Sequence, residues 1–288
     1  MDESRILILG AYGQLGKALQ AKYPQAKAVN HDAFDMTDWD MIEKYDWSGV
    51  DVILNAAVFA NVDGSETPEG REAAWKVNAT GPGYLSKIAG AHNIVLVHIS
   101  SDYVFDGTKN PHTEEEAFTP LGVYGQAKAA GDIAVSTAPK HYIARTSWLI
   151  GDGPNFLRTM MGLADKNISP TVVADQIGRL TFTPTLVAAI DHLLVSKAAY
   201  GTYNVSNDGA PASWADVTRT IFKELGRDDL TVTDTTTDEY FASKTGIAPR
   251  PLKSAFDLTK LRNAGFVASE WPSALHDYIQ DELAKVKE

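Results

Sequence analysis

The stretch Arg5-Ile-Leu-Ile-Leu-Gly-Ala-Tyr-Gly-Gln-Leu-Gly16 decides the fold of this protein. Its first part, Arg5–Leu9, is a short apolar run that predicts a buried strand, and Gln14–Lys22 is predicted to be a helix. Between them the glycines are spaced Gly-x2-Gly-x2-Gly. Glycine permits a tight turn, the approach of a pyrophosphate to the backbone, and close packing of a helix on a strand. The stretch therefore predicts the start of a dinucleotide-binding fold, and the alternative is a tight turn that binds nothing.

The rest of the first half continues to alternate predicted strands with predicted helices. Strands are predicted at Ala26–Val29, Val50–Leu54, Ile94–Ile99 and His141–Arg145, and helices at Asp38–Tyr45, Glu69–Ala91 and Val123–Ser136. Apolar strands separated by helices of this length are typical of an α/β fold of the Rossmann type, a doubly wound parallel sheet with helices on both faces. Residues 1–150 are therefore predicted to form a dinucleotide-binding Rossmann domain.

In the second half, from the loop Gly151–Pro154 onward, strands and helices alternate less regularly. Its predicted helices are Phe156–Lys166, Thr183–Ser196, Trp214–Leu225, Leu258–Ala264 and Trp271–Lys285, and Gly201–Val205 is predicted to be a strand. We expect residues 151–288 to form mainly a smaller C-terminal lobe that binds the substrate. The segment 183–207 is expected to return to the first domain, because its helix–strand pair continues the earlier pattern.

The composition excludes several classes of protein. The chain has 288 residues and no cysteine, so disulfides, thiolate zinc sites and a cysteine nucleophile are excluded. Its 26 basic and 37 acidic residues give a net charge of −11, which argues against a nucleic-acid partner. The acidic N-terminus does not resemble a signal peptide, and no apolar run reaches the roughly 20 residues that a membrane span needs. We therefore expect a cytoplasmic protein with no membrane partner.

The cofactor expected from the glycine loop is NADPH or NADH. Gly10, Gly13 and Gly16 would place its phosphates at the positive end of the following helix. About twenty residues after Gly10, where an acidic residue would bind the ribose of NAD, the chain has Asn30. Asn30 carries no charge, and no arginine stands nearby to hold the extra phosphate of NADP. The sequence therefore leaves the choice between the two cofactors open.

A second group of residues suggests carbonyl reduction. Ser100 and Ser101 follow the strand at 94–99, and Tyr124 and Lys128 stand four residues apart on the next predicted helix. Residues at this spacing share one helix face, and a nearby cation lowers the pKa of a phenol. A serine hydroxyl could bind a ketone, the tyrosine could supply the proton, and the lysine could hold the cofactor ribose. The alternative is an ordinary helix with a half-buried tyrosine and a solvated lysine.

These motifs together resemble the extended short-chain dehydrogenases/reductases, and among them the dTDP-4-dehydrorhamnose reductase family. The shared motifs are Gly13-Gln-Leu-Gly16, Asn55-Ala-Ala57, Ser100-Ser-Asp-Tyr-Val-Phe105, Tyr124 with Lys128, Arg145-Thr-Ser-Trp148, Asn155-Phe156 with Thr159-Met160, Asp175-Gln-Ile-Gly178 and Arg250-Pro251 with Ser254. They cover about residues 5–280 in the right order. The resemblance implies a nicotinamide-dependent reductase that converts the 4-keto group of dTDP-4-dehydro-L-rhamnose to the alcohol, in the last step of dTDP-L-rhamnose synthesis.

Carried over to this chain, the resemblance assigns three sets of residues. The catalytic residues would be Ser101, Tyr124 and Lys128. With the glycine loop included, the cofactor would contact Gly10, Gly13, Gln14, Leu15, Gly16, Asn30, Asp35, Ala56, Ala57 and Lys128. The nucleotide-sugar substrate would contact Val62, Asp63, Ser101, Asp102, Tyr103, Trp148 and Arg250. Two of these residues have ordinary alternatives, since Trp148 could fill the core and Asp102 could be a turn residue.

The chain also departs from the family pattern. Arg179 stands in the motif that normally contains proline, and Lys253 replaces an asparagine. These two cations could bind the diphosphate of the substrate or could be solvated surface charges. Some family members use a glutamate after the glycine loop in a magnesium-linked dimer, but this chain has Ala18 there. We therefore expect no metal and either a monomer or a weak homodimer.

Two other functions are alternatives to this reductase. One is another nucleotide-sugar 4-ketoreductase or epimerase of the same superfamily. Dehydratases of this superfamily typically place Asp-Glu after the serine, and this chain has Asp102-Tyr103, which argues against elimination of water. The other is a regulator that binds a dinucleotide without catalysis. Such proteins commonly lose the tyrosine or the lysine, and this chain retains both.

Overall fold

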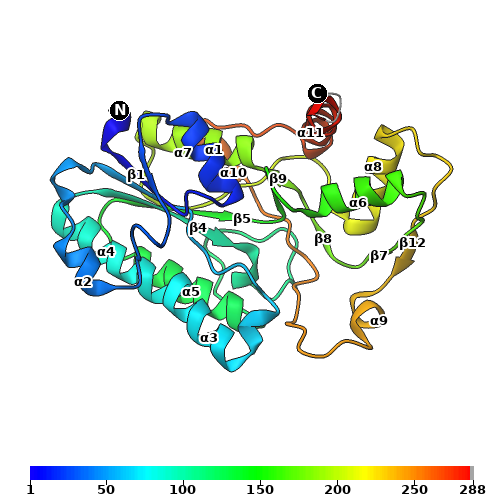
Figure 1. The fold of residues 1–288 in the computed structure, drawn as a ribbon, viewed down its shortest axis with the longest axis horizontal. Helices are drawn as coiled ribbons and strands as arrows, with labels where there is room; N and C mark the ends of the chain where they lie inside the picture. The colour runs from blue at the N-terminus through cyan, green and yellow to red at the C-terminus, as the bar shows by residue number, and fades with distance from the viewer. Residues whose placement is uncertain (286–288) are drawn as a thin grey trace.

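The computed structural model describes residues 1–285, and its larger part is a six-stranded parallel sheet (Figure 1). The strand order is β10-β5-β4-β3-β1-β2, and every neighbouring pair is parallel. The strands are β1 (Ile6–Leu9), β2 (Lys27–Val29), β3 (Val52–Asn55), β4 (Val95–Ser101), β5 (His141–Thr146) and β10 (Gly201–Asn204). This topology confirms the predicted α/β fold class.

Helices cover both faces of the sheet (Figure 1). They are α1 (Gln14–Lys22), α2 (Trp39–Lys44), α3 (Pro68–Trp75), α4 (Gly81–His92), α5 (Val123–Val135), α7 (Thr183–Ser196) and α10 (Thr259–Asn263). A π-helical turn, Lys76–Thr80, joins α3 to α4, so the long helix predicted there is continuous but irregular. The side chain of Asp38 accepts hydrogen bonds from two amides of α2, which explains why that short helix begins where the sequence predicted.

The two faces of β1 enter different cores. Ile6 and Ile8 pack with residues of α1 and α7, whereas Leu7 and Leu9 pack with residues of α2 and α4. Successive side chains of a strand point to opposite faces, so a strand that is apolar at every position must be covered on both sides. The run Ile6–Leu9 therefore specifies a central strand of a doubly wound sheet.

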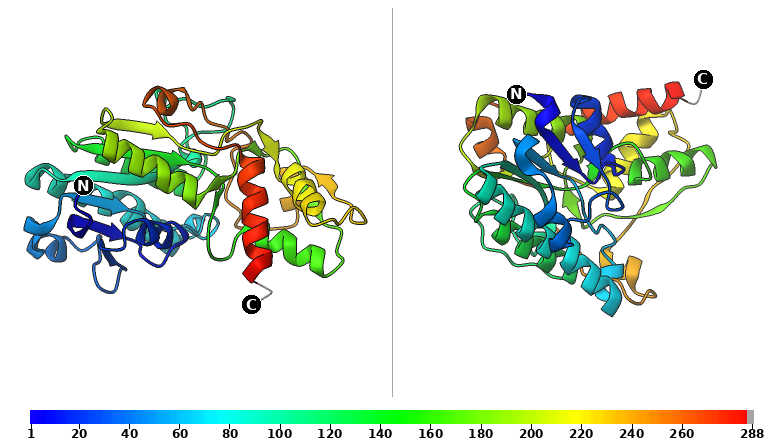
Figure 2. Two further views of the ribbon diagram at one scale, coloured as in Figure 1. Left: turned by 90° about the horizontal axis from the view of Figure 1, so that it is seen from above. Right: turned by 60° about the vertical axis from the view of Figure 1, so that its left-hand side comes forward.

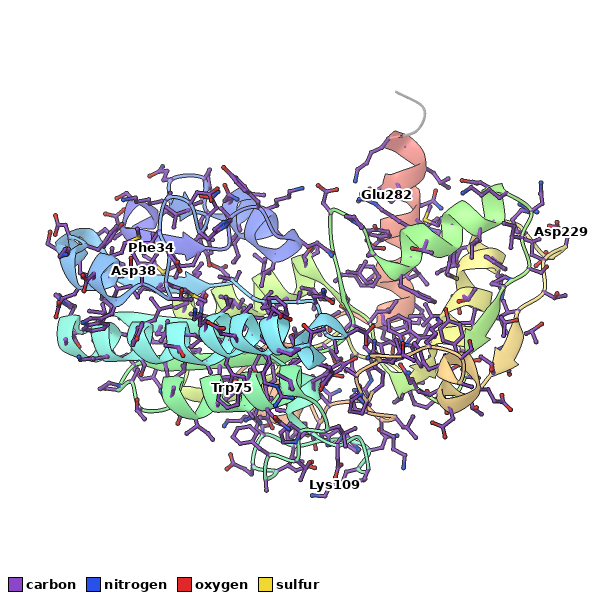
Figure 3. The ribbon with its side chains drawn as sticks, turned by 60° about the horizontal axis from the view of Figure 1, so that its bottom comes forward. Phe34, Asp38, Trp75, Lys109, Asp229 and Glu282 are labelled. Carbon is purple, nitrogen blue, oxygen red and sulfur yellow. The ribbon has the colours of Figure 1, made fainter. Side chains whose placement is uncertain are left out.

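The smaller part of the molecule is a C-terminal lobe beside the carboxyl ends of the strands (Figures 1 and 2). Its elements are β6 (Leu149–Ile150), α6 (Phe156–Asp165), β7 (Thr171–Val173), β8 (Ile177–Gly178), β9 (Thr181–Phe182), β11 (Ala212–Ser213), α8 (Trp214–Glu224), β12 (Thr233–Thr235), α9 (Thr237–Phe241) and α11 (Trp271–Lys285). Residues of α6, α8 and α11 form a separate apolar core. In Figure 3, Asp229 lies at the lobe's far end and Phe34 and Asp38 lie at the opposite end of the molecule.

The chain passes between the two parts more than once. After the first lobe segment, α7 packs on α1 and β10 pairs with β5 at the edge of the large sheet. The chain then re-enters the lobe at β11 and α8. The carboxyl ends of β3, β4 and β5 therefore face loops from both parts of the chain. Within residues 1–285, no helix is both long enough and apolar enough to span a membrane.

Candidate active site

The glycine loop joins β1 to α1, and its glycines serve different purposes. Gly10 has a φ of +80°, and a Cβ there would lie 2.7 Å from the Ala57 amide nitrogen. A Cβ on Gly16 would lie 2.1 Å from the carbonyl oxygen of Gly10. A Cβ on Gly13 would meet that oxygen at an ordinary 3.5 Å, and Gly13 is exposed. The fold therefore requires glycine at the first and last positions, while the middle one leaves room for a ligand.

A cavity of about 700 Å³ brings most of the expected site residues together. Residues that follow β3, β4 and β5 line it, as expected for a ligand site in an open α/β sheet. The expected site residues in its lining are Gly13, Gln14, Leu15, Ala56, Ala57, Val62, Ser101, Asp102, Tyr103, Tyr124, Lys128 and Trp148. The three expected catalytic residues and the glycine loop therefore border the same space.

The lining of this cavity fits a dinucleotide. Gly13 caps α1 without a side-chain hydrogen bond, so the first amide groups of the helix have no side-chain acceptor there. Such a helix start favours phosphate. Oε1 of Gln14 is buried and has no hydrogen-bond partner within residues 1–285. These features would suit the phosphates and a nearby donor group of the cofactor.

A second cavity of about 350 Å³ lies on the β2 side of the glycine loop. The expected residues that line it are Gly10, Gly13, Asn30, Asp35, Ala56 and Ala57. Asp35 accepts hydrogen bonds from the amide and the hydroxyl of Thr37, both at 2.8 Å, and Asn30 donates to Asp32 at 3.0 Å. The described residues around this cavity include no arginine or lysine. The structure thus offers neutral and acidic groups at the place where a ribose would bind.

Ser101, Tyr124 and Lys128 come from β4 and α5. Ser101 ends β4, and the other two residues lie one turn apart on α5. Gly125 allows this approach, because a Cβ there would lie 2.1 Å from the carbonyl oxygen of Tyr103. The Ser101 hydroxyl donates to Oδ1 of Asp102 at 3.0 Å. Strand end and helix start therefore place the serine, the phenol and the lysine at one wall of the large cavity.

The protonation of Tyr124 differs from the expectation. Burial raises the pKa of Tyr124 above its ordinary value, and Asp102 raises it further. The Lys128 ammonium points elsewhere: Nζ donates to the Ile99 carbonyl at 2.5 Å and lies 3.3 Å from His98 Nε2. Burial also lowers the pKa of Lys128 to about 8. The expected lowering of the Tyr124 pKa is therefore wrong for this structure, and the phenol keeps its proton at neutral pH.

Asp102 and Tyr103 form the neighbouring wall of the cavity. Asp102 is 3% exposed, and its Oδ2 has no hydrogen-bond partner within residues 1–285. Burial raises the pKa of Asp102 to about 6. The Tyr103 ring meets the Tyr124 ring edge to face, with 5.4 Å between centroids. A carboxyl group that can change its charge near neutral pH therefore lies beside the phenol.

Trp148 links the two parts of the molecule. It follows β5 with a φ of +47° and stacks on Trp214 of α8, with 3.7 Å between ring centroids. A Cβ on Gly178 would lie 2.9 Å from the Trp148 ring, so glycine makes room for it. Trp148 thus packs on the lobe and also lines the large cavity.

Three of the expected residues line neither cavity. Gly16 lies beneath the loop, and Asp63 and Arg250 are paired with each other at 2.7 Å. The bonded Arg250 holds the pKa of Asp63 below its ordinary value. Both side chains also bond to the backbone of Ala248, Arg250 to its carbonyl at 2.6 Å and Asp63 to its amide at 3.0 Å. This pair connects the segment after β3 to the C-terminal lobe.

The two cations that depart from the family pattern do not reach the site. Arg179 donates to the carbonyl oxygens of Gly209 at 2.6 Å and Phe256 at 2.8 Å. It is a structural cross-link, so both sequence alternatives, a diphosphate ligand and a solvated charge, are wrong for Arg179. Lys253 is exposed, and its Nζ lies 3.4 Å from the Thr108 carbonyl oxygen. Neither residue lines the large cavity.

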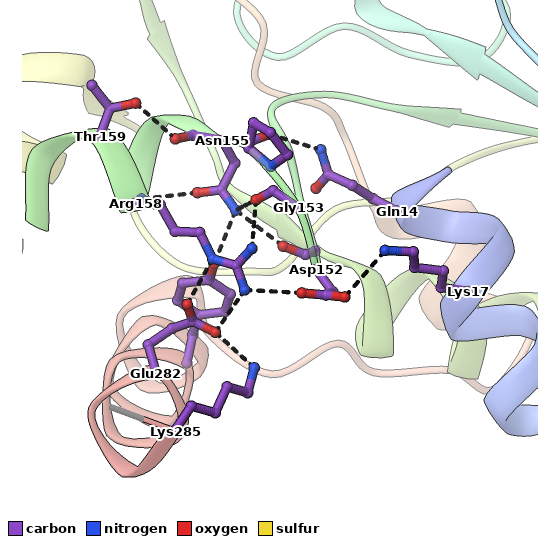
Figure 4. A network of polar contacts seen from close by, with 12 residues as sticks. Gln14, Lys17, Asp152, Gly153, Asn155, Arg158, Thr159, Glu282 and Lys285 are labelled. Carbon is purple, nitrogen blue, oxygen red and sulfur yellow. Dashed lines mark hydrogen bonds and ion pairs between the residues drawn. The ribbon is translucent and has the colours of Figure 1, made fainter. Parts of the chain in front are cut away.

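A network of polar contacts that no sequence motif predicted joins α1 to the loop at 151–154 and to α11 (Figure 4). Gln14 donates to the Pro154 carbonyl at 3.2 Å, and Lys17 pairs with Asp152 at 3.3 Å. Asp152 also pairs with Arg158, which in turn pairs with Glu282 of α11. The loop at 151–154 has no motif, and apart from Asp152 and Arg158 these partners lie more than 100 residues apart in the chain, so no local pattern could have revealed them.

Within residues 1–285, no cluster of three or more His, Cys, Asp or Glu side chains is arranged to hold a metal ion.

Comparisons with known proteins identify the family. The family model described as the RmlD substrate binding domain matches residues 4–284. A dTDP-4-dehydrorhamnose reductase of Aggregatibacter actinomycetemcomitans is 36% identical over 94% of this chain and 97% of its own length. A crystal structure of a dTDP-4-dehydrorhamnose reductase from Clostridium acetobutylicum has a TM-score of 0.86 and 35% identity, covering 96% of this chain and 98% of that one.

A crystal structure of the Bacillus anthracis dTDP-4-dehydrorhamnose reductase, in complex with NADP, is also similar. It has a TM-score of 0.87 and 32% identity, covering 96% of this chain and 99% of that one. The match extends over both parts of the molecule, since it includes the sheet and the C-terminal lobe. The chain therefore belongs to the family of the RmlD substrate binding domain, together with these dTDP-4-dehydrorhamnose reductases.

Proposed function

We propose that this protein reduces the 4-keto group of dTDP-4-dehydro-L-rhamnose to give dTDP-L-rhamnose, with NADPH or NADH as the reductant. The observation that carries the proposal is the convergence of Ser101, Tyr124 and Lys128 on the cavity that the glycine loop also borders. A carbonyl reductase needs a group that binds the ketone, a proton donor and a dinucleotide site in one space. This chain belongs to the family and has all three features, and this combination supports the proposed reaction.

Tyr124 is the proposed proton donor. The phenol is protonated at neutral pH, as reduction requires, but its raised pKa makes it a weaker acid than a free phenol, so proton transfer depends on stabilisation of the phenolate. The Ser101 hydroxyl would turn from Asp102 to bind the ketone oxygen, on which negative charge develops. Lys128 would turn from the Ile99 carbonyl to stabilise the phenolate that remains after the proton has left.

The cofactor would be held by the glycine loop and α1. Gly13 gives the phosphates access to the backbone, and Gln14 has a buried oxygen free to accept a hydrogen bond. The small residues Ala56 and Ala57 line both cavities and leave space for the ribose and nicotinamide. When bound, the dinucleotide would supply the hydride.

The C-terminal lobe is proposed to bind the nucleotide of the substrate. Trp148 packs on this lobe and lines the cavity, so the sugar would lie where the two parts meet. Val62, Asp102 and Tyr103 would contact it from the sheet side. Binding energy from the remote nucleotide can orient the ketone for reaction. Arg250 would contribute from the lobe, in spite of its pairing with Asp63.

The test is spectroscopic. Purified protein is mixed with NADPH or NADH and dTDP-4-dehydro-L-rhamnose, and the loss of absorbance at the nicotinamide band is followed. We expect turnover with the keto sugar and none with dTDP-glucose, which offers no ketone. Turnover of a different 4-keto nucleotide sugar alone would favour another ketoreductase. Dinucleotide binding without turnover of any keto sugar would favour a non-catalytic role.

We also propose that the protein acts in the cytoplasm as a monomer or a weak homodimer. The acidic chain without cysteine supports this expectation. Analytical ultracentrifugation at several protein concentrations provides the test. A dimer that persists upon dilution to nanomolar concentration would contradict the proposal of weak association.

A further inference from the structure

A cluster of buried charged side chains contains Lys128, one of the proposed catalytic residues, and two residues that do not line the large cavity. Lys128 is 1% exposed, and Asp132, one turn further along α5, is 2% exposed. Arg145 of β5 is 3% exposed, and its Nε donates to Oδ2 of Asp132 at 2.9 Å. Charges this deeply buried are unfavourable unless each is balanced. Lys128 therefore requires an anion that balances its charge.

The hydrogen bonds around His98 leave the charge of Lys128 unbalanced. Asn55 Oδ1 accepts the Ala57 amide at 3.2 Å, so Asn55 Nδ2 donates to His98 Nδ1 at 3.1 Å. This assignment places the imidazole proton on Nε2, which faces Lys128 Nζ at 3.3 Å. His98 then cannot accept a hydrogen bond from the ammonium. The Ile99 carbonyl, at 2.5 Å, accepts one but carries no charge.

Asp132 is placed to balance that charge. Its Oδ1 has no hydrogen-bond partner within residues 1–285 and lies 4.0 Å from the same His98 nitrogen that Lys128 approaches. Its Oδ2 is held by Arg145. Arg145 is itself fixed by the Glu114 carbonyl at 3.0 Å. The Asp132 carboxylate is therefore paired directly with Arg145 and acts on the charge of Lys128 through space.

We propose that Asp132 is a positioning residue for the reaction: fixed by Arg145, it holds Lys128 as an ammonium ion one turn along α5 from Tyr124, so that the functional motif on α5 is Tyr-x3-Lys-x3-Asp. This inference rests on the proposed reductase function for its role in catalysis. It is supported by the direction of the pKa shifts, since burial lowers the pKa of Lys128 and Asp132 acts against this. The same burial raises the pKa of Asp132, and Arg145 acts against that.

The titratable groups that face this cluster come from three elements. They are Tyr124 and Asp132 of α5, His98 of β4 and Arg145 of β5, with Asp102 beyond Tyr124. Burial lowers the pKa of His98 well below its ordinary value, so His98 is neutral and contributes no charge. Asp132 is therefore the group whose removal should change the charge state of Lys128 most.

The first test measures Lys128 in the protein without ligands. Lysine Cε resonances are followed by NMR across pH 6–11, and Lys128→Met identifies the Lys128 signal. In Asp132→Asn, loss of the anion should lower the Lys128 pKa by about one unit or more. Asp132→Glu, which keeps the charge, should stay within about half a unit of wild type. A shift below about 0.3 units in Asp132→Asn, or equal shifts in both variants, would overturn the proposal.

A series of variants at Asp132 and Arg145 distinguishes an effect of charge from an effect of misfolding. Asp132→Asn leaves Arg145 buried without an anion and could prevent folding. In Asp132→Asn/Arg145→Met both members of the pair are absent, so the Lys128 pKa should lie between those of wild type and Asp132→Asn. In Arg145→Met alone, Lys128 is the remaining cation that Asp132 balances. The pKa of Lys128 should therefore stay at or above its wild-type value. Equal lowering in all three variants would indicate a packing effect and would refute the proposal.

The second test uses the proposed reaction. If Lys128 must be charged, the alkaline limb of the kcat profile of Asp132→Asn should move to lower pH by the same interval as the NMR shift. An NMR shift together with an unmoved kcat profile would refute the catalytic role of the cluster. If wild type reduces no keto sugar, the proposed function fails, and the NMR titration still decides whether Asp132 controls Lys128.

Discussion

The sheet domain and the C-terminal lobe hold their charged groups in different environments. In the sheet domain Lys128 and Asp132 are almost inaccessible to solvent. In the lobe the pair Arg219–Asp234 has side chains 43% and 56% exposed, and Arg227 pairs with an Asp229 that is 63% exposed. Water screens exposed pairs, so each is worth little, whereas a buried charge depends on each partner. Single changes at Lys128 or Asp132 should therefore have strong effects, and single changes in these exposed pairs of the lobe weak ones.

Several buried polar atoms also lack a hydrogen-bond partner among the described residues. Within residues 1–285, the buried ones include Gln14 Oε1, Ser100 Oγ and Asp102 Oδ2, and all three side chains line the large cavity. In the lobe, Arg179 donates to two backbone carbonyls, and Oγ1 of Thr181 lacks a partner within residues 1–285. Unsatisfied groups in a native protein often mark a functional site. The three atoms beside the large cavity support the proposal that the reaction takes place there.

The largest expected effect is the loss of turnover in Tyr124→Phe. Removal of the phenol hydroxyl removes the proton donor, which should reduce kcat by roughly 10²- to 10⁴-fold. Tyr240→Phe, which changes an exposed tyrosine of the lobe, should keep normal turnover and serves as the control. The measurement is steady-state kinetics together with calorimetric binding of the dinucleotide, which should remain close to wild type. Near-normal turnover in Tyr124→Phe would remove the tyrosine from the mechanism.

The next effect concerns stability and pH. The pKa of Asp102 is raised from 3.8 to about 6 by burial, so between these values the folded protein binds more protons than the unfolded chain. The contribution of Asp102 to the free energy of unfolding therefore falls as pH rises through this window, by about 3 kcal/mol for a shift of this size. Asp102→Asn removes this cost, so its stability relative to wild type should increase between pH 4 and pH 7.

Urea unfolding at several pH values measures this difference. Asp229→Asn in the lobe is the control, because a hydrogen bond donated by Arg227 lowers the pKa of Asp229, and the pH range in which the contribution of this carboxylate to stability changes therefore lies below 3.8. The stability of Asp229→Asn relative to wild type should therefore stay nearly constant between pH 4 and pH 7. A pH-independent difference between Asp102→Asn and wild type would show that Asp102 has an ordinary pKa.

A third comparison lies within the glycine loop. Gly16→Ala would place a Cβ 2.1 Å from a carbonyl oxygen, and should lower the free energy of unfolding by about 2–3 kcal/mol. Gly13→Ala meets only an ordinary contact, so its unfolding should stay close to wild type while dinucleotide binding weakens. Thermal unfolding and calorimetry test the two variants. Unchanged cofactor affinity in a folded Gly13→Ala protein would mean that the loop is only a turn.

The smallest expected effect is in the lobe. Arg250→Ala should weaken binding of the 4-keto sugar nucleotide by about 1.5–3 kcal/mol and leave dinucleotide affinity unchanged, as for a hydrogen bond to a charged group. Lys253→Ala, three residues along and exposed, should change either affinity by less than about 0.5 kcal/mol. Titrations of both variants with both ligands provide the measurement. Equal losses for the two ligands in Arg250→Ala would indicate altered folding instead of a substrate contact.

Much of this architecture could be predicted from local patterns. The apolar run at 6–9, the glycine spacing and the strand–helix alternation predicted the fold class, and the bounds of most elements differ by one or two residues. Tyr124 and Lys128 could be paired because the helix period brings positions four apart to one face. Their shared cavity with Ser101 also agrees with the prediction, since carboxyl ends of parallel strands meet at one edge.

Tertiary structure decided the charge states and the long-range pairings. The sequence placed a cation beside Tyr124, but packing directed that cation to Ile99 and His98, and burial raised the pKa of the phenol. Arg250 could not be matched with Asp63 from the sequence, nor Lys17 with Asp152. Periodicity and turn chemistry act over a few residues, so they determine elements and short spacings. Desolvation and ion pairing depend on which distant segments pack together, and only the folded chain specifies this.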